Sequence, residues 1–335
     1  MPAQTVGLKA EESAADRIQQ ELDRKAGRKE RIALVLPYLG FVLLTVFFEA
    51  ATKGQFLGLK NLVLLVNQSF TMVIVMVGAV FLYSMGCMDM SLGSVMAISS
   101  LITAEMYNQG IPLLVCALVG ILVSVASFNI TASAKNYLQI DPFIASLCVS
   151  NVALGIVTAV CKQGKVVFKY STAQWLTYTS TKLIALILVI GIGYVLYART
   201  TLGKSLRAIG GNGTVAKISG IQVKKVRHLA YTTIGIVVGV ASLFTLARSG
   251  VVDPTVGGTL NLNVMIGIVL GGFPLSGGAN AKFSTPIVGA LMVTILTNGL
   301  GLMGQANAVG YLVKGILFTL VVALTYERSK GKLIS

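Results

Sequence analysis

Two short stretches of the sequence resemble motifs that bind nucleotide phosphates. Residues 198–205 read A-R-T-T-L-G-K-S, and residues 211–216 read G-N-G-T-V-A. In a true phosphate loop, backbone N–H groups and a lysine hold the phosphates, and the loop follows a buried strand. Here the first stretch follows a long apolar run, and no Asp or Glu occurs between 142 and 252 to hold Mg²⁺. The sequence therefore predicts that this chain does not hydrolyse ATP.

Residues for other catalytic or metal chemistry are scarce. His228 is the only histidine, so a Ser-His-Asp set would have to be built on it. The four cysteines, Cys87, Cys116, Cys148 and Cys161, show no C-x-x-C spacing. We expect no metal site, no cofactor and no enzymatic activity.

A few polar side chains interrupt the apolar runs. Asp89 and Ser91 can cap a helix, or the carboxylate can lie on a functional path. Asn67, Gln68 and Asn298 can contact hydroxyl groups of a polar solute, or form hydrogen bonds between helices. Both pairs of interpretations stay open at this point.

The composition shows which elements must hold these side chains. Hydrophobic residues make up 55% of the 335-residue chain and charged residues 12%, and the mean hydropathy is +0.80. Soluble domains carry about 25% charged residues, so an ordinary soluble enzyme is excluded. Helices that span a bilayer need about 20 apolar residues. Ten intervals nearly free of charge are candidates: 32–48, 61–88, 90–104, 111–134, 143–161, 183–198, 229–247, 254–281, 283–313 and 310–326. The sequence predicts an all-α integral membrane protein with about ten transmembrane helices.

The basic residues predict the orientation. The net charge is +15, but the Lys and Arg residues lie between the apolar intervals instead of forming one face, so we expect a lipid bilayer and no nucleic acid as partner. With the leader in the cytoplasm and Lys314 set aside, 19 basic residues lie inside and seven outside. We expect a polar leader at 1–31, a membrane domain at 32–326 and a tail at 327–335, with both termini cytoplasmic.

Glycines mark close packing and helix breaks. The G-x-x-x-G spacings at 235–239 and 267–271 allow two helices to approach closely. Four glycines and a proline then gather near one membrane edge: Gly271, Gly272, Pro274, Gly277 and Gly278. Such a cluster predicts a glycine-rich helix break or a re-entrant turn, which often lines a transport pathway.

The longest internal polar loop covers 199–228. Residues 210–211 are expected to turn the chain, Asn212 to cap a short amphipathic helix, and 219–220 to end it. The positive charge can simply fix the topology and contact anionic lipid. Alternatively, the loop docks a cytosolic partner.

Four stretches together resemble a known family. They are M-D-M-S-L-G-S at 88–94, the loop at 202–221, L-G-G-F-P-L-S-G-G at 270–278, and the segment 298–314 with its N-G-L and V-K-G. In this order they resemble the membrane permeases of bacterial ABC importers of the ribose and other monosaccharide type, which are related to the branched-chain amino acid permeases.

The resemblance implies that residues 203–220 form a coupling helix that fits a cleft of a separate ABC ATPase subunit. Ala216 is expected to be small enough to sit tightly in that cleft. The residues expected to couple are Gly203, Arg207, Gly210, Gly211, Asn212, Ala216, Ser219 and Gly220. Further implied partners are an extracytoplasmic substrate-binding protein and a second permease chain, identical or paralogous.

The resemblance also implies a multi-pass protein of the bacterial cell membrane that forms the path for a monosaccharide or a related small polar solute. Candidate path or gate residues are Asn67, Gln68, Asp89, Ser91, Gly271, Gly272, Gly277, Gly278 and Asn298.

Some residues depart from the family pattern. Cys87 follows Gly86 where a second glycine is usual, and Asn261 and Asn263 stand where an acidic residue is frequent. The cargo therefore stays open between a monosaccharide, a nucleoside, a sugar-like signal and a branched-chain amino acid. An ion-coupled secondary transporter and a membrane scaffold or receptor are the alternative classes, but charge inside the apolar intervals is sparse.

Overall fold

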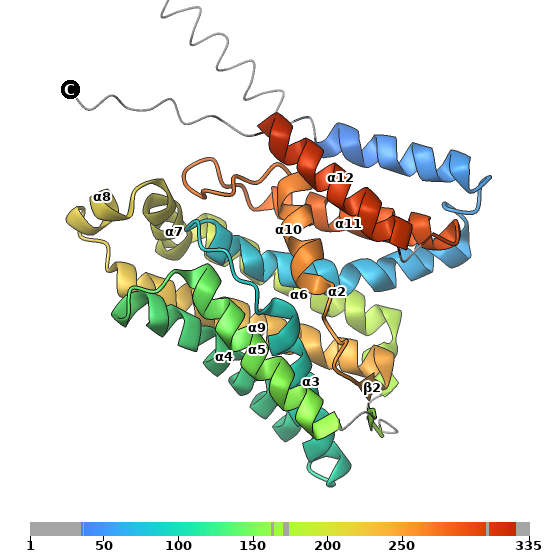
Figure 1. The fold of residues 1–335 in the computed structure, drawn as a ribbon, viewed down its shortest axis with the longest axis horizontal. Coiled ribbons are helices and arrows are strands. Elements are labelled where there is room, and N and C mark those ends of the chain that lie inside the picture. Colours follow the sequence, from blue (N-terminus) through green and yellow to red (C-terminus); the bar gives the residue numbers. More distant parts are fainter. Residues whose placement is uncertain (1–34, 36, 162–163, 170–173, 306–307, 326–335) are drawn as a thin grey trace, which may run out of the picture.

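The computed structural model describes residues 35, 37–161, 164–169, 174–305 and 308–325, and these fold almost entirely into helices (Figure 1). Six helices are long and apolar enough to cross a membrane. They are α2 (Leu59–Tyr83), α4 (Leu113–Tyr137), α5 (Pro142–Cys161), α6 (Thr179–Tyr194) with its π-helical end η2 (Val195–Arg199), α9 (Val223–Ser249) and α11 (Ser284–Leu302). This is the architecture of an all-α membrane protein, as the composition predicts.

Shorter helices lie between and beside these six. They are Pro37–Ala51, α3 (Leu92–Asn108), α10 (Leu260–Leu270) and α12 (Ala308–Thr325). Each of the ten apolar intervals overlaps a helix in the described part of the chain. The number of membrane crossings and the side on which the termini lie stay predictions, because the leader at 1–31 and the tail at 327–335 are outside the described residues.

Helices end inside two of the predicted intervals. Helix α2 ends at Tyr83, before the predicted 88, and α10 has 11 residues of the interval 254–281. Eleven residues span about 16 Å, whereas the hydrocarbon core is about 30 Å thick. Gly86 and Gly272 have φ values of 70° and 73°, which a helix does not contain. The glycine cluster predicted the break in 254–281, whereas the expectation of one helix across 61–88 is wrong, because the apolar run there does not reveal its interruption.

The helices divide into a central and a peripheral set. In the most apolar stretch of α2, α9 and α11, 56%, 56% and 67% of the residues are buried. In α4, α5 and α6 only 22%, 22% and 17% are buried. The exposed side chains of the peripheral helices are mostly apolar, which suits contact with lipid.

The G-x-x-x-G segments pack helices closely, as predicted. A Cβ on Gly235 of α9 would lie 2.6 Å from the Cα of Val125 in α4. A Cβ on Gly289 of α11 would lie 1.8 Å from the carbonyl oxygen of Gly267 in α10. Only glycine permits these backbones to come so near.

The bundle has two distinct ends (Figure 1). At one end, α7 (Thr201–Gly211) and α8 (Gly213–Ile218) extend from the long helices. At the other end, β2 (Val251–Val252) pairs antiparallel with β1 (Val166–Val167), and the short helix η1 (Gln174–Thr177) follows β1. The loop 199–228 is therefore mostly helical and lies far from the β1–β2 ribbon.

Candidate functional site

The α7–α8 segment is a helical hairpin with a defined turn. Asn212 caps α8, because its Oδ1 accepts hydrogen bonds from the N–H groups of Thr214 at 3.0 Å and Val215 at 3.1 Å. The cap was predicted, but the turn at 210–211 was not placed correctly. Both glycines are in the last turn of α7, and the chain turns at Asn212, which has an extended backbone. Gly220, with φ 86°, follows the end of α8. Residues 198–205 form the end of η2 and the start of α7 and so do not make a phosphate loop.

Gly210 brings α7 against two other segments. A Cβ at this position would lie 2.1 Å from the carbonyl oxygen of Ser84 and 2.6 Å from the backbone nitrogen of Gly278. The Ser84 oxygen accepts a hydrogen bond from the Gly278 N–H at 3.0 Å. Gly211 has no such neighbour within 4 Å. The contact thus needs glycine at 210 and tolerates other residues at 211.

The partner-facing role expected for Ala216 is wrong. Ala216 is 3% exposed and packs into the hydrophobic core of its own chain. The outward face of α8 instead carries Val215 and Ile218, which are 56% and 81% exposed. Five of the six residues of α8 are exposed, and only Ala216 among them is buried. Val215 and Ile218 therefore give the exposed surface of α8 two large apolar side chains, beside the exposed Lys217. The pattern of small residues does not show that Ala216 packs inward.

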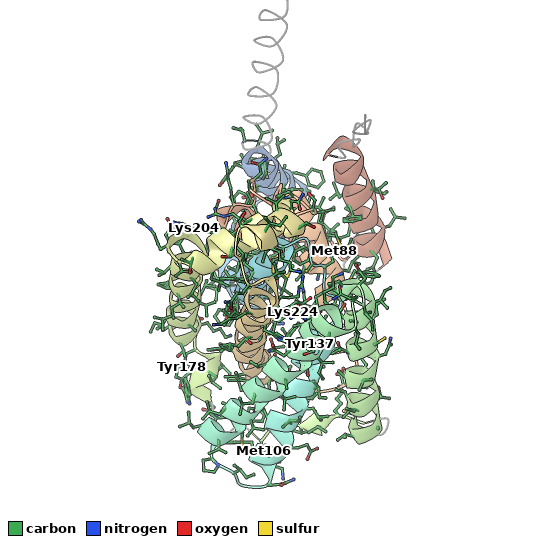
Figure 2. The ribbon with its side chains drawn as sticks, turned by 90° about the vertical axis from the view of Figure 1, so that its left-hand side faces the viewer. Met88, Met106, Tyr137, Tyr178, Lys204 and Lys224 are labelled. Atoms are coloured by element: carbon green, nitrogen blue, oxygen red, sulfur yellow. The ribbon has the colours of Figure 1, made fainter. Side chains whose placement is uncertain are left out.

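The remaining residues predicted to couple differ in their surroundings. Gly203 is buried against η2, and a Cβ there would lie 1.8 Å from the carbonyl oxygen of Tyr197. The guanidinium carbon of Arg207 lies 5.3 Å from the centre of the Tyr197 ring. Ser219 is exposed at the end of α8. In Figure 2, which views the bundle from the α7–α8 end, Lys204 projects outward from α7.

Residues 84–91 connect α2 to α3 without helix, and we call them the 84–91 linker. The backbone N–H of Met90 donates to Ser146 Oγ at 2.9 Å, and the Met90 carbonyl accepts from Asn261 Nδ2 at 2.5 Å. Asn261 lies in the first turn of α10, whereas Ser84, where the linker begins, contacts the loop after α10. The linker therefore runs along α10 from one end to the other, and Met88 lies within the outline of the bundle in Figure 2.

Asp89 lies in this linker and is 1% exposed. Ser91 occupies the N-cap position of α3, but neither its side chain nor that of Asp89 makes a capping hydrogen bond to α3, so the capping interpretation is wrong. Its Oδ1 accepts hydrogen bonds from the backbone N–H of Ser91 at 2.8 Å and from Ser91 Oγ at 2.5 Å. Within the described residues its Oδ2 has no hydrogen-bond partner.

The glycine cluster after α10 forms a break, as predicted, and we call residues 271–283 the 271–283 loop. Gly272, Gly277 and Gly278 have φ values of 73°, 71° and 97°, which favour glycine. A Cβ on Gly277 would lie 2.4 Å from the carbonyl oxygen of Ser84. Gly271 is helical in φ and instead allows close contact with the start of α11. The 84–91 linker and the 271–283 loop thus pack directly against each other.

A polar cluster lies toward the β1–β2 end of α2 and α11. Asn61 Nδ2 donates to Asn298 Oδ1 at 2.9 Å, and Asn298 Nδ2 donates to Gln68 Oε1 at 3.3 Å. The Oδ1 of Asn61 has no partner within the described residues. The sequence indicated Gln68 and Asn298 but missed Asn61, which stands at the very start of an apolar interval. The structure brings all three together.

Two lysines are buried next to amides in the same half of the bundle. Lys182 Nζ donates to the predicted path residue Asn67 at 2.8 Å, so Asn67 belongs to a second polar pair. Lys314 Nζ donates to Asn263 Oδ1 at 3.0 Å. Both lysines are 6% exposed. The pairing joins α6 to α2 and α12 to α10, and neither pair was predicted, because sequence does not show which helices are neighbours.

The chain matches a known family over most of its length. The family model described as branched-chain amino acid transport system, permease component, matches residues 61–322. This range includes the two breaks between helices, which are the 84–91 linker and the 271–283 loop. It also includes the α7–α8 segment and the polar cluster.

Individual relatives match at low identity but over nearly their whole length. The chain is 28% identical to the ribose import permease protein of Bacillus subtilis (strain 168), covering 88% of this chain and 92% of that protein. It is 27% identical to the D-allose transport system permease protein of Escherichia coli (strain K12), covering 86% and 90%. It is also 27% identical to the fructose import permease protein of Rhizobium meliloti, covering 88% and 83%. No solved structure gives a significant match.

Proposed function

This chain belongs to the family of branched-chain amino acid transport system permease components, and we propose that it is the membrane-spanning permease of an ATP-driven importer for a monosaccharide. Relatives that match it over 86–88% of its length are named as permeases for ribose, D-allose and fructose. These names favour a monosaccharide over a branched-chain amino acid. The chain is a transport subunit, not an enzyme, and a multi-pass protein of the bacterial inner membrane.

The single observation that carries the coupling role is the exposed apolar face of α8. Val215 and Ile218 are open to solvent at one end of the bundle, on a short helix that Asn212 caps. A surface of this kind, on a rigid hairpin outside the apolar bundle, suits insertion into a cleft of a cytosolic ATPase. The ATPase subunit then supplies the ATP chemistry that this chain lacks.

The contacts of α7 suggest how movement of the ATPase reaches the path. When the ATPase subunits close on ATP, α8 and α7 move together because Asn212 joins them closely. Gly210 touches Ser84 and Gly278, so this movement shifts the 84–91 linker and the 271–283 loop as a pair. Both are breaks between helices, where a small displacement opens or closes a pathway. ATP binding thereby changes the populations of the outward and inward states.

The outer half of the path is proposed to contact the sugar through amides. Asn61, Asn298 and Gln68 offer both donors and acceptors, which is the chemistry that hydroxyl groups need. The unpartnered Oδ1 of Asn61 is an acceptor ready for a hydroxyl donor. Asp89 and Ser91, deeper in the bundle, are proposed to lie at the gate.

The proposal requires three partners: the ABC ATPase subunit, an extracytoplasmic substrate-binding protein, and a second permease chain. Purification in mild detergent with mass-spectrometric identification of bound chains tests it. We expect an ATPase subunit and two permease chains per complex. Recovery of the permease with no ATPase, at matched membrane abundance, would contradict the proposal.

A further inference from the structure

A pocket of about 430 Å³ lies beside α7, between the end of α6 and the start of α11. Its inner wall includes Tyr197 and Phe283, and Ile287 adds apolar surface. Arg207 and Lys282 line it as well, and Lys282 is exposed. The pocket thus combines an apolar wall with two cations.

Within the described part of the chain, no carboxylate pairs with either cation. The sequence contains no Asp or Glu from 254 to 326, and none from 142 to 252, so α6, α7 and α11 carry no acidic residue. Among the described residues, no ion pair involves Arg207 or Lys282. The contact of Arg207 with the Tyr197 ring orients the guanidinium without removing its charge. An anion is the complementary ligand.

The surface next to the pocket shows what kind of anion fits. The outward face of α6 exposes Ile184, Ile187 and Ile192 at 61%, 68% and 60%. At its end, where the pocket begins, stands Tyr194, an aromatic residue typical of the membrane–water interface. A molecule with acyl chains along α6 and a negative headgroup in the pocket matches both parts of this surface.

We propose that the pocket binds the phosphate group of an anionic phospholipid from the cytoplasmic leaflet. The choice of leaflet rests on the proposed orientation, with α7 and α8 in the cytoplasm. Arg207 and Lys282 bind the phosphate, Tyr194 lies at the headgroup level, and the acyl chains follow α6. The shared chemistry is a phosphate monoanion, which a lipid or free phosphate could supply, and the acyl contacts favour the lipid.

The pocket is directly connected to the two breaks. Tyr197, which forms its wall, shares a hydrogen bond with Ser84 Oγ at 2.7 Å and donates to the Ala281 carbonyl at 3.0 Å. Tyr197 therefore joins η2 to the end of α2 and to the 271–283 loop. A bound headgroup holds Arg207 over this ring and stabilises the arrangement of both breaks.

Native mass spectrometry of the purified full-length chain tests the site. Delipidated protein is titrated with palmitoyl-oleoyl phosphatidylglycerol, with the phosphatidylcholine of the same acyl chains, and with inorganic phosphate. Each Lys or Arg near an anionic lipid contributes about fivefold in affinity, so Arg207→Gln with Lys282→Gln should weaken phosphatidylglycerol binding roughly twenty-five-fold. Lys204→Gln, an exposed lysine of α7 outside the pocket, should leave it unchanged.

A second variant tests the same site independently, in case the double variant misfolds. Ala279→Trp places a large side chain in the lining of the pocket and keeps both charges, and we expect it to abolish tight phosphatidylglycerol binding as well. Equal binding of the two lipids would overturn the proposal, as would an equal loss in Lys204→Gln. Competition by inorganic phosphate at the same concentration would identify a free-anion site instead of a lipid site. Binding is measured without the ATPase or transport, so the outcome does not depend on the proposed import function.

Discussion

Asp89 is a buried carboxylate without a counter-charge, which is a costly group in a protein interior. Its only hydrogen-bond donors in the described structure come from Ser91, and Oδ2 is left without a partner. An asparagine could accept the same two hydrogen bonds through its Oδ1 without carrying a charge. The charge of Asp89 therefore adds nothing to these hydrogen bonds, which makes Asp89 the residue to test for the proposed gate.

We predict that Asp89→Asn stabilises the purified chain at pH 8. The change removes a buried charge and keeps an oxygen that accepts both hydrogen bonds from Ser91.

Thermal unfolding in detergent at pH 8 measures this difference, with Ser91→Ala as the comparison that lowers stability by removing a donor. If Asp89→Asn unfolds at or below the temperature of the unchanged chain, the buried charge does not lower stability.

Among single residues, the sequence correctly predicted those whose role depends only on residues close to them in the chain. Asn212 stands before a short polar helix, and its cap needs only neighbours two and three residues away, so the pattern N-G-T was sufficient. The prediction for Ala216 was wrong because the burial of this residue depends on the packing of α8 against the rest of the chain. Asn61 was missed for the same reason, since its partner Asn298 is 237 residues away.

At the level of elements, α7 is held to the two breaks by a backbone contact that only glycine allows. We predict that Gly210→Ala destabilises the chain by about 1 to 3 kcal/mol, because the new methyl group would overlap the Ser84 carbonyl. Gly211→Ala is the matched control, with nothing within 4 Å of its Cβ. Thermal unfolding and ATP-driven uptake are measured for both. Equal stability and equal uptake of the two variants would show that α7 does not take part in coupling.

The apolar face of α8 leads to a separate prediction about docking. Ile218→Glu should leave the stability of the purified chain unchanged, because the side chain is 81% exposed, but should reduce recovery of the ATPase about thirtyfold. Ile218→Leu preserves the apolar surface and should recover the ATPase fully. If Ile218→Glu binds the ATPase as well as the unchanged chain does, α8 is a topogenic basic segment and not a coupling helix.

Helices with long uninterrupted apolar runs were predictable, since length and hydropathy are sufficient for α4, α5 and α9. The two breaks between helices were harder to predict. The glycine cluster predicted the 271–283 loop, whereas the 84–91 linker contains one glycine with positive φ, Gly86, in an apolar sequence. The contact between linker and loop follows from tertiary packing, which apolar patterning does not contain.

For the whole molecule, the count of 19 basic residues inside and seven outside predicts that both termini are cytoplasmic. Lys165 and Lys217 are both exposed and lie next to β1 and in α8, at opposite ends of the bundle. In a Cys148→Ala background, we predict that an impermeant thiol reagent labels Lys165→Cys in intact cells and does not label Lys217→Cys. Labelling of both cysteines after lysis is the control. The reverse pattern in intact cells would show the opposite topology.

The whole assembly combines an apolar bundle, two breaks in contact with each other, and a hairpin that presents an apolar face. In the proposed transport cycle, the bundle forms the path, the two breaks form the gate, and the hairpin contacts the ATPase. The alternative, an ion-coupled transporter, would rely on the buried charges Asp89, Lys182 and Lys314 and would need no ATPase.

Uptake by proteoliposomes decides between these two mechanisms. The permease is reconstituted with its co-purifying ATPase and binding protein, and radiolabelled ribose, allose and fructose are supplied outside. We predict that at least one of the three sugars enters, that entry requires enclosed ATP and all three components, and that a sodium or proton gradient does not replace ATP. Uptake by the permease alone under an ion gradient, or no ATP-dependent uptake of any of the three sugars, would contradict the account.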